Sequence, residues 1–591
     1  MLLLGLVLCA VSTPVLAQSA CSSRATPIYD VQGSGQTAAM TGVHTVRGVV
    51  VGDYEGGSPA LRGFYLQEAR GDGDPETSDA IFVFNGGGRD LVEPGDVVTV
   101  RGRVGEFEGQ TQLSASDVTV CGRGTIAPVD VYLPVPNAEY LERYEGMLVR
   151  FPQTLYVTES FQLGRFGQVV LSVDGRLPQP TAVALPGPES AAVEVANALA
   201  TIILDDASNG QNPAVIHFGG GGEQLSASNT LRGGDTVTGA VGVLTYTWAG
   251  DAASGNAWRL RPLGALGGGV PAFASVNPRP AVPDVGGDLR VASLNVLNYF
   301  TTLRSRGADS SLELQRQRAK LVATLVGLDA DIVGLIELEN DPAAIEDLTD
   351  ALNEALGGDA YAAVQTGVLG IDEITVGLIY RRTSVAPVGE YAALDNTFDR
   401  AFREHHNRPV LAQAFVDASG RTVTVGVAHL KSKGSDCLDV GDRDPGDGQG
   451  NCNGTRTQAA SLLARWLATD PTGSGDPDVL VLGDFNAYRY EDPVLALEAA
   501  GYTSLLHELH GDEAYTFVFD GRWGALDHAF ASPSLRGQVT GAAAWHVNAD
   551  EPSVLDYNVE FKSRDQVDRL YAPDPYRGSD HDPVLVGIRL R

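Results

Sequence analysis

The sequence predicts a multidomain protein in which an all-β region precedes an α/β domain. Residues 27 to about 125 carry short runs in which apolar and polar side chains alternate with a period of two, as in Val98–Val104. The proline-rich stretch Asn277–Pro283 is followed by two glycines, which is typical of a linker. After it, apolar runs alternate with segments that carry leucines at helical spacing, and this alternation indicates an α/β domain.

The chain begins with an apolar run that predicts a signal peptide over residues 1–17. The run is too short to span a bilayer, so we expect a secreted protein, with the periplasm as an alternative, and no transmembrane segment. Four cysteines follow it and predict two disulfides. The short separation of Cys437 and Cys452 favours that pair, which leaves Cys21 with Cys121.

Two β-rich domains are predicted before the linker, at residues 18–125 and 126–275. In the first, Thr45–Val51 and Gly63–Gln67 are expected strands, separated by turns rich in glycine and aspartate. Short strands with such connections suggest a small barrel or sandwich. The second domain continues in the same style and shows no group of residues typical of catalysis. The linker itself is assigned to residues 276–287.

The α/β domain is predicted at residues 288–591. A serine and a glutamate at positions 310 and 313 form a capping-box pattern at the start of one helix, and Asp341-Pro342 starts another. Apolar runs at Asp331–Leu338 and Val479–Leu482 predict buried strands. Unusual polar side chains follow directly after such runs, so we expect the chemistry of this domain at its strand ends.

The charge of the chain limits how it can meet an anionic partner. Its net charge of −32 opposes non-specific binding to polyanions, so a nucleic-acid substrate requires local cations or metal ions. Of only four lysines, Lys431 and Lys433 follow His429 with the same strand parity, which suits an anionic substrate. A solvated strand end is the alternative. Arg408 and Arg456 offer further guanidinium groups near strand or helix starts.

Two polar residues interrupt otherwise apolar segments and are candidate metal ligands. Asn295 lies inside a predicted strand, and Glu337 closes another. Each is a poor core residue unless something binds it. Mg²⁺ prefers a few protein oxygen ligands and keeps water for the rest, so an amide and a carboxylate at adjacent strand ends suit it. A helix cap or a strand-end hydrogen bond is the alternative for either residue.

An acid–amide pair, Asp484 and Asn486, follows the buried strand Val479–Leu482. Two residues apart in an extended segment, they project to the same side and could align a water and steady a phosphoryl oxygen. Asp527 is a further acid at a strand end, and Asp580 precedes His581 in a turn before an apolar run. Two imidazoles, an acid–amide pair and hard-metal ligands indicate metal-assisted phosphoester hydrolysis.

Seven segments resemble, in order, the motifs of the endonuclease/exonuclease/phosphatase superfamily. They are Ser293–Asn295, Leu335–Glu337, Gly377–Tyr380, Val427–Leu430, Gly483–Asn486, Leu526–His528 and Ser579–Pro583. Within this order, His429–Gly434 and Cys452–Gln458 resemble the ExeM/NucH type of secreted bacterial nuclease. The N-terminal β region, with Gly63–Gln67, is similar to the OB-fold-like module that often precedes that domain.

The resemblance implies a C-terminal four-layered α/β sandwich with its site at one edge of two packed sheets, preceded by an OB-like region. It implies that Asn295 and Glu337 bind Mg²⁺ with help from Asp580, with Mn²⁺ or Ca²⁺ as alternative ions. Asp484 is expected to align or deprotonate the attacking water, assisted by Asn486.

The resemblance also implies how the phosphate is held. His581, oriented by Asp580 or Asp527, and His429 are expected to donate hydrogen bonds to the scissile phosphate, whose charge grows in the transition state. Two further residues match positions that touch phosphate in relatives, Tyr380 and Arg408. The expected function is hydrolysis of DNA, with RNA as a second substrate. The alternatives are a phosphodiesterase or phosphatase for lipid head groups or small phosphoesters, and a non-catalytic cell-surface binding protein.

The loop 435–451 carries four acids between two cysteines. They are Asp439, Asp442, Asp444 and Asp447. The loop could bind Ca²⁺ or form a rim over the substrate groove. The simpler interpretation is an extracellular insertion closed by the Cys437–Cys452 disulfide.

Overall fold

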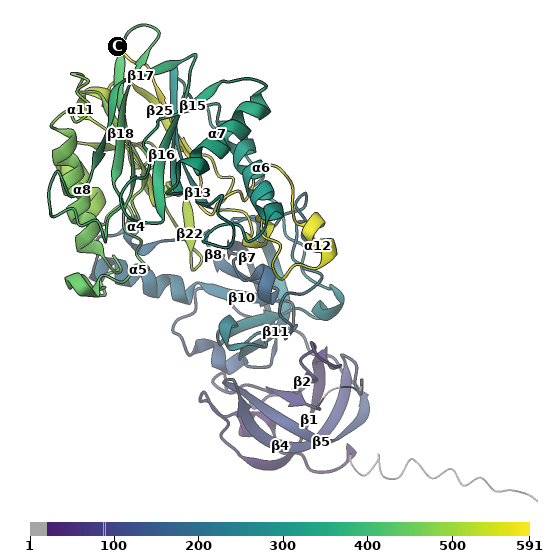
Figure 1. Cartoon of the computed structure of the whole chain (residues 1–591). Coiled ribbons are helices and arrows are strands. Elements are labelled where there is room, and N and C mark those ends of the chain that lie inside the picture. The colour runs from purple at the N-terminus through teal and green to yellow at the C-terminus, as the bar shows by residue number, and fades with distance from the viewer. Residues whose placement is uncertain (1–20, 87, 89) are drawn as a thin grey trace, which may run out of the picture.

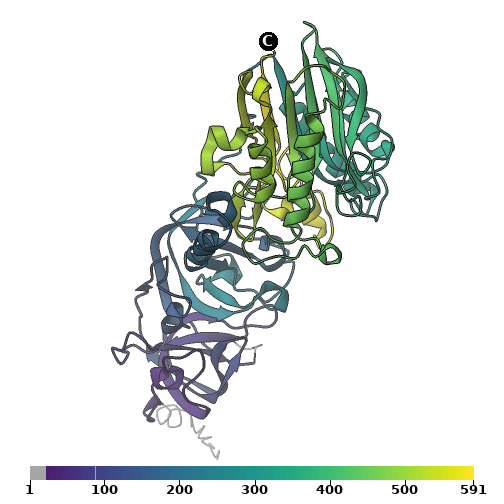
Figure 2. The same cartoon turned by 90° about the vertical axis from the view of Figure 1, so that its left-hand side faces the viewer.

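The structure is a computed structural model and describes residues 21–86, 88 and 90–591. Three bodies follow one another along an elongated molecule (Figures 1 and 2). The N-terminal strands lie at one end, a second β-rich body lies in the middle, and the α/β body lies at the other end. The predicted signal peptide, residues 1–17, falls outside the described residues. In the part that is described, no helix combines the length and the apolar character needed to cross a membrane.

The first body is a closed five-stranded barrel with the strand order β1-β2-β3-β5-β4. Its strands are β1 (Gly42–Tyr54), β2 (Gly63–Gln67), β3 (Ala80–Phe84), β4 (Asp96–Phe107) and β5 (Gln110–Arg123), preceded by the helix α2 (Ile28–Gln32). Val46, Phe64 and Leu113 are fully buried inside it, because alternate residues of each strand face inward. The predicted Cys21–Cys121 disulfide is present. The OB-like assignment of this barrel stays a prediction.

The second body is a six-stranded sheet that closes on itself, because β11 pairs with both β12 and β7. Its strands are β6 (Val129–Asp130), β7 (Leu148–Glu159), β8 (Gln168–Val173), β10 (Thr201–Asp205), β11 (Thr236–Thr247) and β12 (Ala257–Arg261), with helices α3 (Leu163–Phe166), α4 (Pro180–Val183) and α5 (Pro188–Leu199) between them. The helix α5 was not predicted. It buries only Ser190 and Asn197, so its sequence lacks the apolar stripe that indicates a helix.

The third body contains two six-stranded sheets. In pairing order, the first consists of β15 (Tyr361–Ala363), β16 (Ile374–Arg381), β14 (Ile332–Glu339), β13 (Leu289–Tyr299), β26 (Val584–Ile588) and β25 (Val539–Ala544). The second consists of β17 (Val385–Leu394), β18 (Val410–Asp417), β19 (Thr422–His429), β20 (Val479–Asp484), β24 (Asp527–Ala531) and β21 (Thr503–Ser504). Val291 and Val425 belong to one buried cluster between the sheets, so the two sheets pack face to face.

Helices cover the outer face of each sheet. They are α6 (Ser311–Leu328), α7 (Pro342–Leu356), α8 (Asn453–Leu467) and α9 (Asp492–Ala499). Three shorter helices, α10 (Leu505–His510), α11 (Pro533–Arg536) and α12 (Arg564–Arg569), lie elsewhere in this body. Leu321 of α6 and Leu348 of α7 pack on the first sheet, and Leu463 of α8 packs on the second. The predicted four-layered α/β sandwich is therefore observed (Figure 1).

Both predicted helix starts are confirmed, and each has a side-chain cap. The Ser310 hydroxyl accepts a hydrogen bond from the Glu313 N–H at 3.3 Å, and the Asp341 carboxylate accepts one from the Ala343 N–H at 2.9 Å. Each cap satisfies a backbone donor that has no partner inside the helix.

A hairpin of the sandwich is built onto the second body. It consists of β22 (Phe517–Phe519) and β23 (Arg522–Gly524), and β23 pairs in parallel with β9 (Leu177–Pro178) of the second body. The Trp523 indole N–H donates to the Thr158 carbonyl at 3.0 Å. Figure 1 shows β22 at the boundary between the two bodies. The three-stranded sheet formed in this way is shared by both.

A buried charge network joins the same two bodies. Arg232, only 1% exposed, donates through Nη2 to Asp550 at 2.7 Å and also pairs with Glu551. Arg279, in the segment predicted as a linker, donates to the second oxygen of Glu551 at 2.9 Å. Both carboxylate side chains are fully buried. Because an unpaired buried charge is costly, this network fixes the second body on the sandwich.

Replacing Arg232 by alanine should therefore destabilise the protein strongly. We expect a loss of about 3–5 kcal/mol in the free energy of unfolding, because the buried Asp550 carboxylate loses its main partner and Glu551 keeps only one of its two arginines. Urea unfolding followed by tryptophan fluorescence measures it. The matched control is Arg150→Ala, which removes an exposed pair with Asp130 and should cost about 1 kcal/mol or less. Equal losses in the two variants would contradict the role given to the network.

Candidate active site

The site lies where neighbouring strands of the second sheet end. His429 is the last residue of β19, Asp484 is the last of β20, and Asp527 is the first of β24. The register pairs His429 with Asp484 and Asp484 with Asp527, so the three residues lie side by side. Because β19 and β20 are parallel, their carboxyl ends meet at one edge. The predicted grouping of these residues at strand ends is therefore observed.

Asp484 lies between two imidazoles. Its Oδ2 is 3.6 Å from Nε2 of His429 and 3.9 Å from Nε2 of His581. Its other oxygen, Oδ1, accepts a hydrogen bond from the backbone N–H of Asn486 at 2.8 Å. Asn486 has a left-handed backbone (φ 46°), and its side chain donates to the Leu430 carbonyl at 3.2 Å. Asn486 thus holds Asp484 so that one oxygen faces both rings.

His581 is oriented by Asp527 and not by Asp580. Its Nδ1 lies 2.7 Å from Oδ2 of Asp527, and the Thr516 hydroxyl donates to the same oxygen at 2.7 Å. The ring of Phe517 lies against the imidazole with centroids 4.5 Å apart. Of the two orienting acids that the resemblance implied, the structure therefore selects Asp527.

A buried asparagine that was not predicted holds the turn before His581. The Asn548 side chain donates to the His581 carbonyl at 2.6 Å and accepts from the N–H groups of Gly578 and Ser579. Asp582 is also structural, because it accepts from the Asn548 N–H at 2.8 Å. No sequence pattern marks Asn548, since its partners lie about thirty residues further along the chain.

The surroundings shift the pKa values of the two imidazoles, His581 and His429, in opposite directions. Burial alone would lower the pKa of His581, but the charges of Asp527 and Asp484 outweigh it and raise that pKa well above its ordinary value. Burial, with the charge of Arg408, lowers the pKa of His429 well below its ordinary value. Burial raises the pKa of Asp484 to about 7 against the opposing charge of His581. The site therefore holds a cationic and a neutral imidazole beside one carboxyl group.

Glu337 reaches the site from the first sheet through a local distortion. The register of β14 with β16 shifts at this residue, which has a left-handed backbone (φ 68°). Such a bulge redirects a side chain, here towards His429, whose Nε2 lies 3.9 Å from the Glu337 carboxylate. The ligand atoms of Glu337, His429 and Asp484 all lie within 4.8 Å of one another.

The predicted metal ligands fit a divalent cation. Burial and the charge of Asp580 raise the pKa of Glu337, so two carboxylates repel each other there. A cation between them would relieve that repulsion. Asn295 is buried beside them on β13, with its Oδ1 accepting from the Leu297 N–H at 2.9 Å and its Nδ2 without a partner. Carboxylate and amide oxygens are the ligands that Mg²⁺ prefers.

Two predicted phosphate-binding residues lie close to the site. Arg408 donates to the Leu430 carbonyl at 3.2 Å and to Asp372 at 3.1 Å, and its charge acts on His429. Burial, and then the charge of Arg408, lower the pKa of Lys431. Arg306, which was not predicted, lies 3.8 Å from Asp372 and also acts on His429.

The side chains of Lys433 and Arg456 donate their hydrogen bonds to other groups of the protein. Their predicted assignment to phosphate binding is therefore wrong. Lys433 donates to both oxygens of Glu491, at 2.5 and 2.6 Å. Arg456 is fully buried and donates to the carbonyls of Lys431, Gln449 and Asn451. Since β19 ends at His429, the strand parity on which the Lys433 prediction rested does not continue.

Tyr380 is not brought to the site. It pairs with Ile332 at the start of β14, five residues before Glu337, or roughly 15 Å along the strand. Its ring lies beside Phe415, with centroids 5.5 Å apart. The sequence motif locates the strand that carries Tyr380 but not which end of that strand reaches the site.

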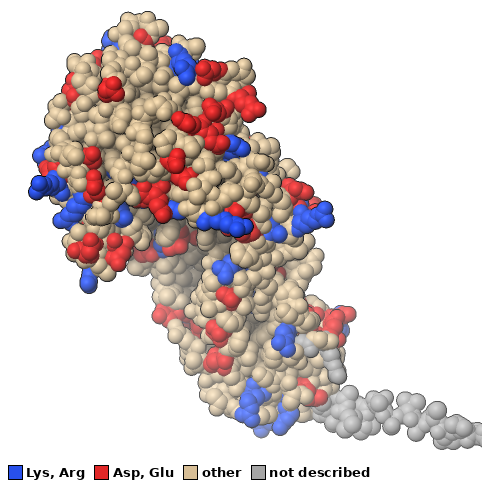
Figure 3. Space-filling view, viewed as in Figure 1, with Lys and Arg blue, Asp and Glu red and all other residues tan. Residues whose placement is uncertain are grey.

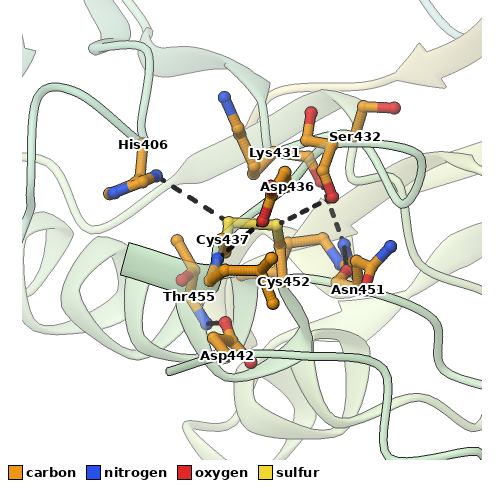
Figure 4. The surroundings of a disulfide bond; sticks show 12 residues. His406, Lys431, Ser432, Asp436, Cys437, Asp442, Asn451, Cys452 and Thr455 are labelled. Carbon is orange, nitrogen blue, oxygen red and sulfur yellow. Dashed lines mark hydrogen bonds between the residues drawn. A yellow bond between two sulfur atoms is a disulfide. The ribbon is translucent and has the colours of Figure 1, made fainter. Parts of the chain in front are cut away.

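The acidic loop 435–451 is closed by the predicted Cys437–Cys452 disulfide (Figure 4). Asp442 accepts from the N–H groups of Gly454 and Thr455 at the start of α8, and Asp439 lies 2.9 Å from Nε2 of His406. Each of these carboxylates is thus engaged within the protein. The contacts favour a disulfide-closed insertion over a calcium site.

The comparisons with known proteins concern the sandwich. Residues 292–581 match the model of the Endonuclease/Exonuclease/phosphatase family. Its members are hydrolytic phosphoesterases that include nucleases, phosphodiesterases and phosphatases, and they generally use divalent metals. A search of curated proteins gives no match.

Three solved structures are similar to this domain at low identity. The human Nocturnin catalytic domain with bound sulfate is 16% identical, covers 51% of this chain and 94% of that chain, and has a TM-score of 0.34. A mannosyl-6-phosphatase of Bacteroides thetaiotaomicron is 17% identical, with coverages of 51% and 99% and a TM-score of 0.34. D. rerio TDP2 complexed with a single-strand DNA product is 16% identical, with coverages of 50% and 97% and a TM-score of 0.32.

Removing the loop disulfide should lower stability. Its cysteines are 15 residues apart, and closing a loop of that length contributes about 3 kcal/mol through the entropy of the unfolded chain. We expect the double variant Cys437→Ala/Cys452→Ala to lose that amount in chemical unfolding of the sandwich. The control is Cys21→Ala/Cys121→Ala, which should affect the barrel and leave the sandwich transition in place. An unchanged sandwich transition in the loop variant would refute the expectation.

Proposed function

We propose that the protein is a secreted, metal-dependent nuclease that hydrolyses phosphodiester bonds of DNA, with RNA as a second substrate. The observation that carries the proposal is Asp484 between one cationic and one neutral imidazole, close to the carboxylate of Glu337. This arrangement suits in-line attack of water on a phosphate whose negative charge grows in the transition state.

The charge of each residue determines its role in the proposed reaction. Asp484 accepts the proton of the attacking water, and Asn486 keeps its carboxylate aimed at that water. His581, held cationic by Asp527, donates from Nε2 to a phosphoryl oxygen. The neutral ring of His429 can donate a further hydrogen bond. A divalent cation bound by Asn295, Glu337 and Asp580 would supply Lewis-acid stabilisation of the developing charge and lower the pKa of nearby acids. Arg408 and Lys431 attract the anionic substrate.

Two disulfides support secretion, because such bonds persist in oxidising compartments. The predicted signal peptide would direct the chain into the secretory pathway.

A second candidate is hydrolysis of small phosphoesters or lipid head groups. It is favoured by the charge of the molecule, which is −32 overall. Acidic and basic side chains are interspersed on the face shown in Figure 3, with no broad basic surface there. Long-range attraction of a polyanion is therefore weak, and a small substrate needs none. A non-catalytic binding protein is disfavoured because a buried carboxylate lies 3.6 and 3.9 Å from two imidazoles, an arrangement that binding alone does not require.

The roles of Asp484 and His581 can be tested by substitution. Asp484→Asn removes the general base and should lower kcat on plasmid DNA by about 10²–10⁴-fold. His581→Ala removes the cationic donor and should lower it by about 10²–10³-fold. Tyr380→Phe, remote from the site, is the control and should keep wild-type activity. Circular dichroism checks the fold, and near-full activity in both site variants would exclude the mechanism.

Removing divalent ions should abolish hydrolysis. EDTA should stop DNA cleavage, and Mg²⁺ or Mn²⁺ should restore it, because the oxygen ligands bind hard cations. Calorimetry of Mg²⁺ binding should show weaker binding in Glu337→Gln. The control Asp90→Asn removes a carboxylate from the other acidic group among the described residues, Asp53, Glu55 and Asp90. Full activity in EDTA, or equal Mg²⁺ affinity in all three proteins, would exclude the metal role.

A further inference from the structure

A cavity of about 290 Å³ lies between the second body and the sandwich, beside His581. Asp580 lines it, and so does Phe517, whose ring lies against the His581 imidazole. The second body contributes the wall at Glu159–Phe161, which follows the end of β7. The cavity therefore lies next to His581, separated from it by the Phe517 ring, and part of its wall belongs to a different domain.

Two exposed phenylalanines line this cavity from opposite bodies. Phe161 of the second body is 71% exposed, and Phe519 of the hairpin β22–β23 is 57% exposed. Large aromatic side chains left in water beside a catalytic site are available to stack on a flat ligand. Both walls are held in place, since the Ser553 hydroxyl donates to the Phe161 carbonyl at 3.1 Å and β23 pairs with β9.

The charged side chains that line the cavity are four acids and Arg577, and the excess of acids suits a ring with amino groups better than a phosphate. Glu159 and Asp520 line it, and burial, with the charge of Asp520, raises the pKa of Glu159 to about 7. Carboxylates repel a phosphate but accept hydrogen bonds from the exocyclic amino groups of nucleobases. Stacking surfaces with nearby carboxyl acceptors are thus matched to a base.

We propose that this interdomain cavity binds the nucleobase next to the scissile phosphate, between Phe161 and Phe519. The proposal rests on the nuclease function proposed above and adds a substrate class to it. A base can enter such a cavity only if it is unpaired and unstacked, so the preferred substrate is single-stranded nucleic acid. The second body is then part of the substrate site.

A second cavity adjoins the first one. It has a volume of about 640 Å³ and shares Phe161 and Ser553 with the first. Phe561, which is 81% exposed, lines it together with Arg306, whose charge also acts on His429. The following nucleotides can therefore stack on Phe561 while their phosphates pass Arg306.

The test compares two oligonucleotides that differ by one base. One is an intact single-stranded DNA with a unique cleavable linkage, and the other carries an abasic analogue at the nucleotide flanking that linkage. The wild type should cleave the intact strand at least about fivefold faster in kcat/KM, the minimum expected for one stacked base. The double variant Phe161→Ala/Phe519→Ala should lose this preference and fall to the abasic rate on both. Tyr132→Ala removes an exposed aromatic elsewhere in the second body and should behave as wild type.

The outcomes separate the two proposals. If the wild type cleaves both strands equally fast, or if the double variant keeps the preference, the base site is refuted while the nuclease function stands. If the double variant slows both strands equally, the phenylalanines hold a sugar ring and not a base. If the wild type cleaves no nucleic acid but hydrolyses a sugar phosphate, the nuclease function fails and the base site fails with it.

Discussion

The buried pair between Asp527 and His581 is the interaction on which the site depends. Two charges removed from water stabilise each other only when they lie close together and their remaining polar atoms have hydrogen-bond partners. The Thr516 hydroxyl, the Asn548 amide and the Phe517 ring provide that support. With this pair intact, His581 stays cationic, and Asp484 lies between one charged and one neutral imidazole ring. Without it, burial would lower the pKa of His581, and the proposed phosphate site would lose its cationic donor.

The segments that give this support are themselves held by the second body. Thr516 and Phe517 begin a hairpin that pairs with the second body, and Asn548 lies two residues before Asp550, a partner of Arg232. The family match at residues 292–581 describes the sandwich alone. Here the sandwich has the proposed catalytic side chains. The neighbouring domain fixes the segments that orient His581 and contributes to the cavity beside it.

The sequence predicted what depends on local pattern. Apolar strands with a polar last residue located His429 and Asp484, and caps located both helix starts, because these signals involve residues close in the chain. Lys433 could not be assigned correctly, since its partner Glu491 is 58 residues away and no pattern links them. Arg306 and Asp372 belong to loops without periodicity. Roles set by contacts between distant segments were visible only in three dimensions.

The shared sheet of β9, β22 and β23 also constrains the order of assembly. During synthesis, Leu177 and Pro178 emerge long before Arg522 and Trp523, so β9 has an unpaired edge until most of the chain is made. Such edges invite pairing with other chains. The brevity of β9, two residues with a proline, limits that hazard. The second body is therefore complete only after the hairpin β22–β23 has been made. The edge of the sandwich that carries the candidate site is then among the last parts of the molecule to form.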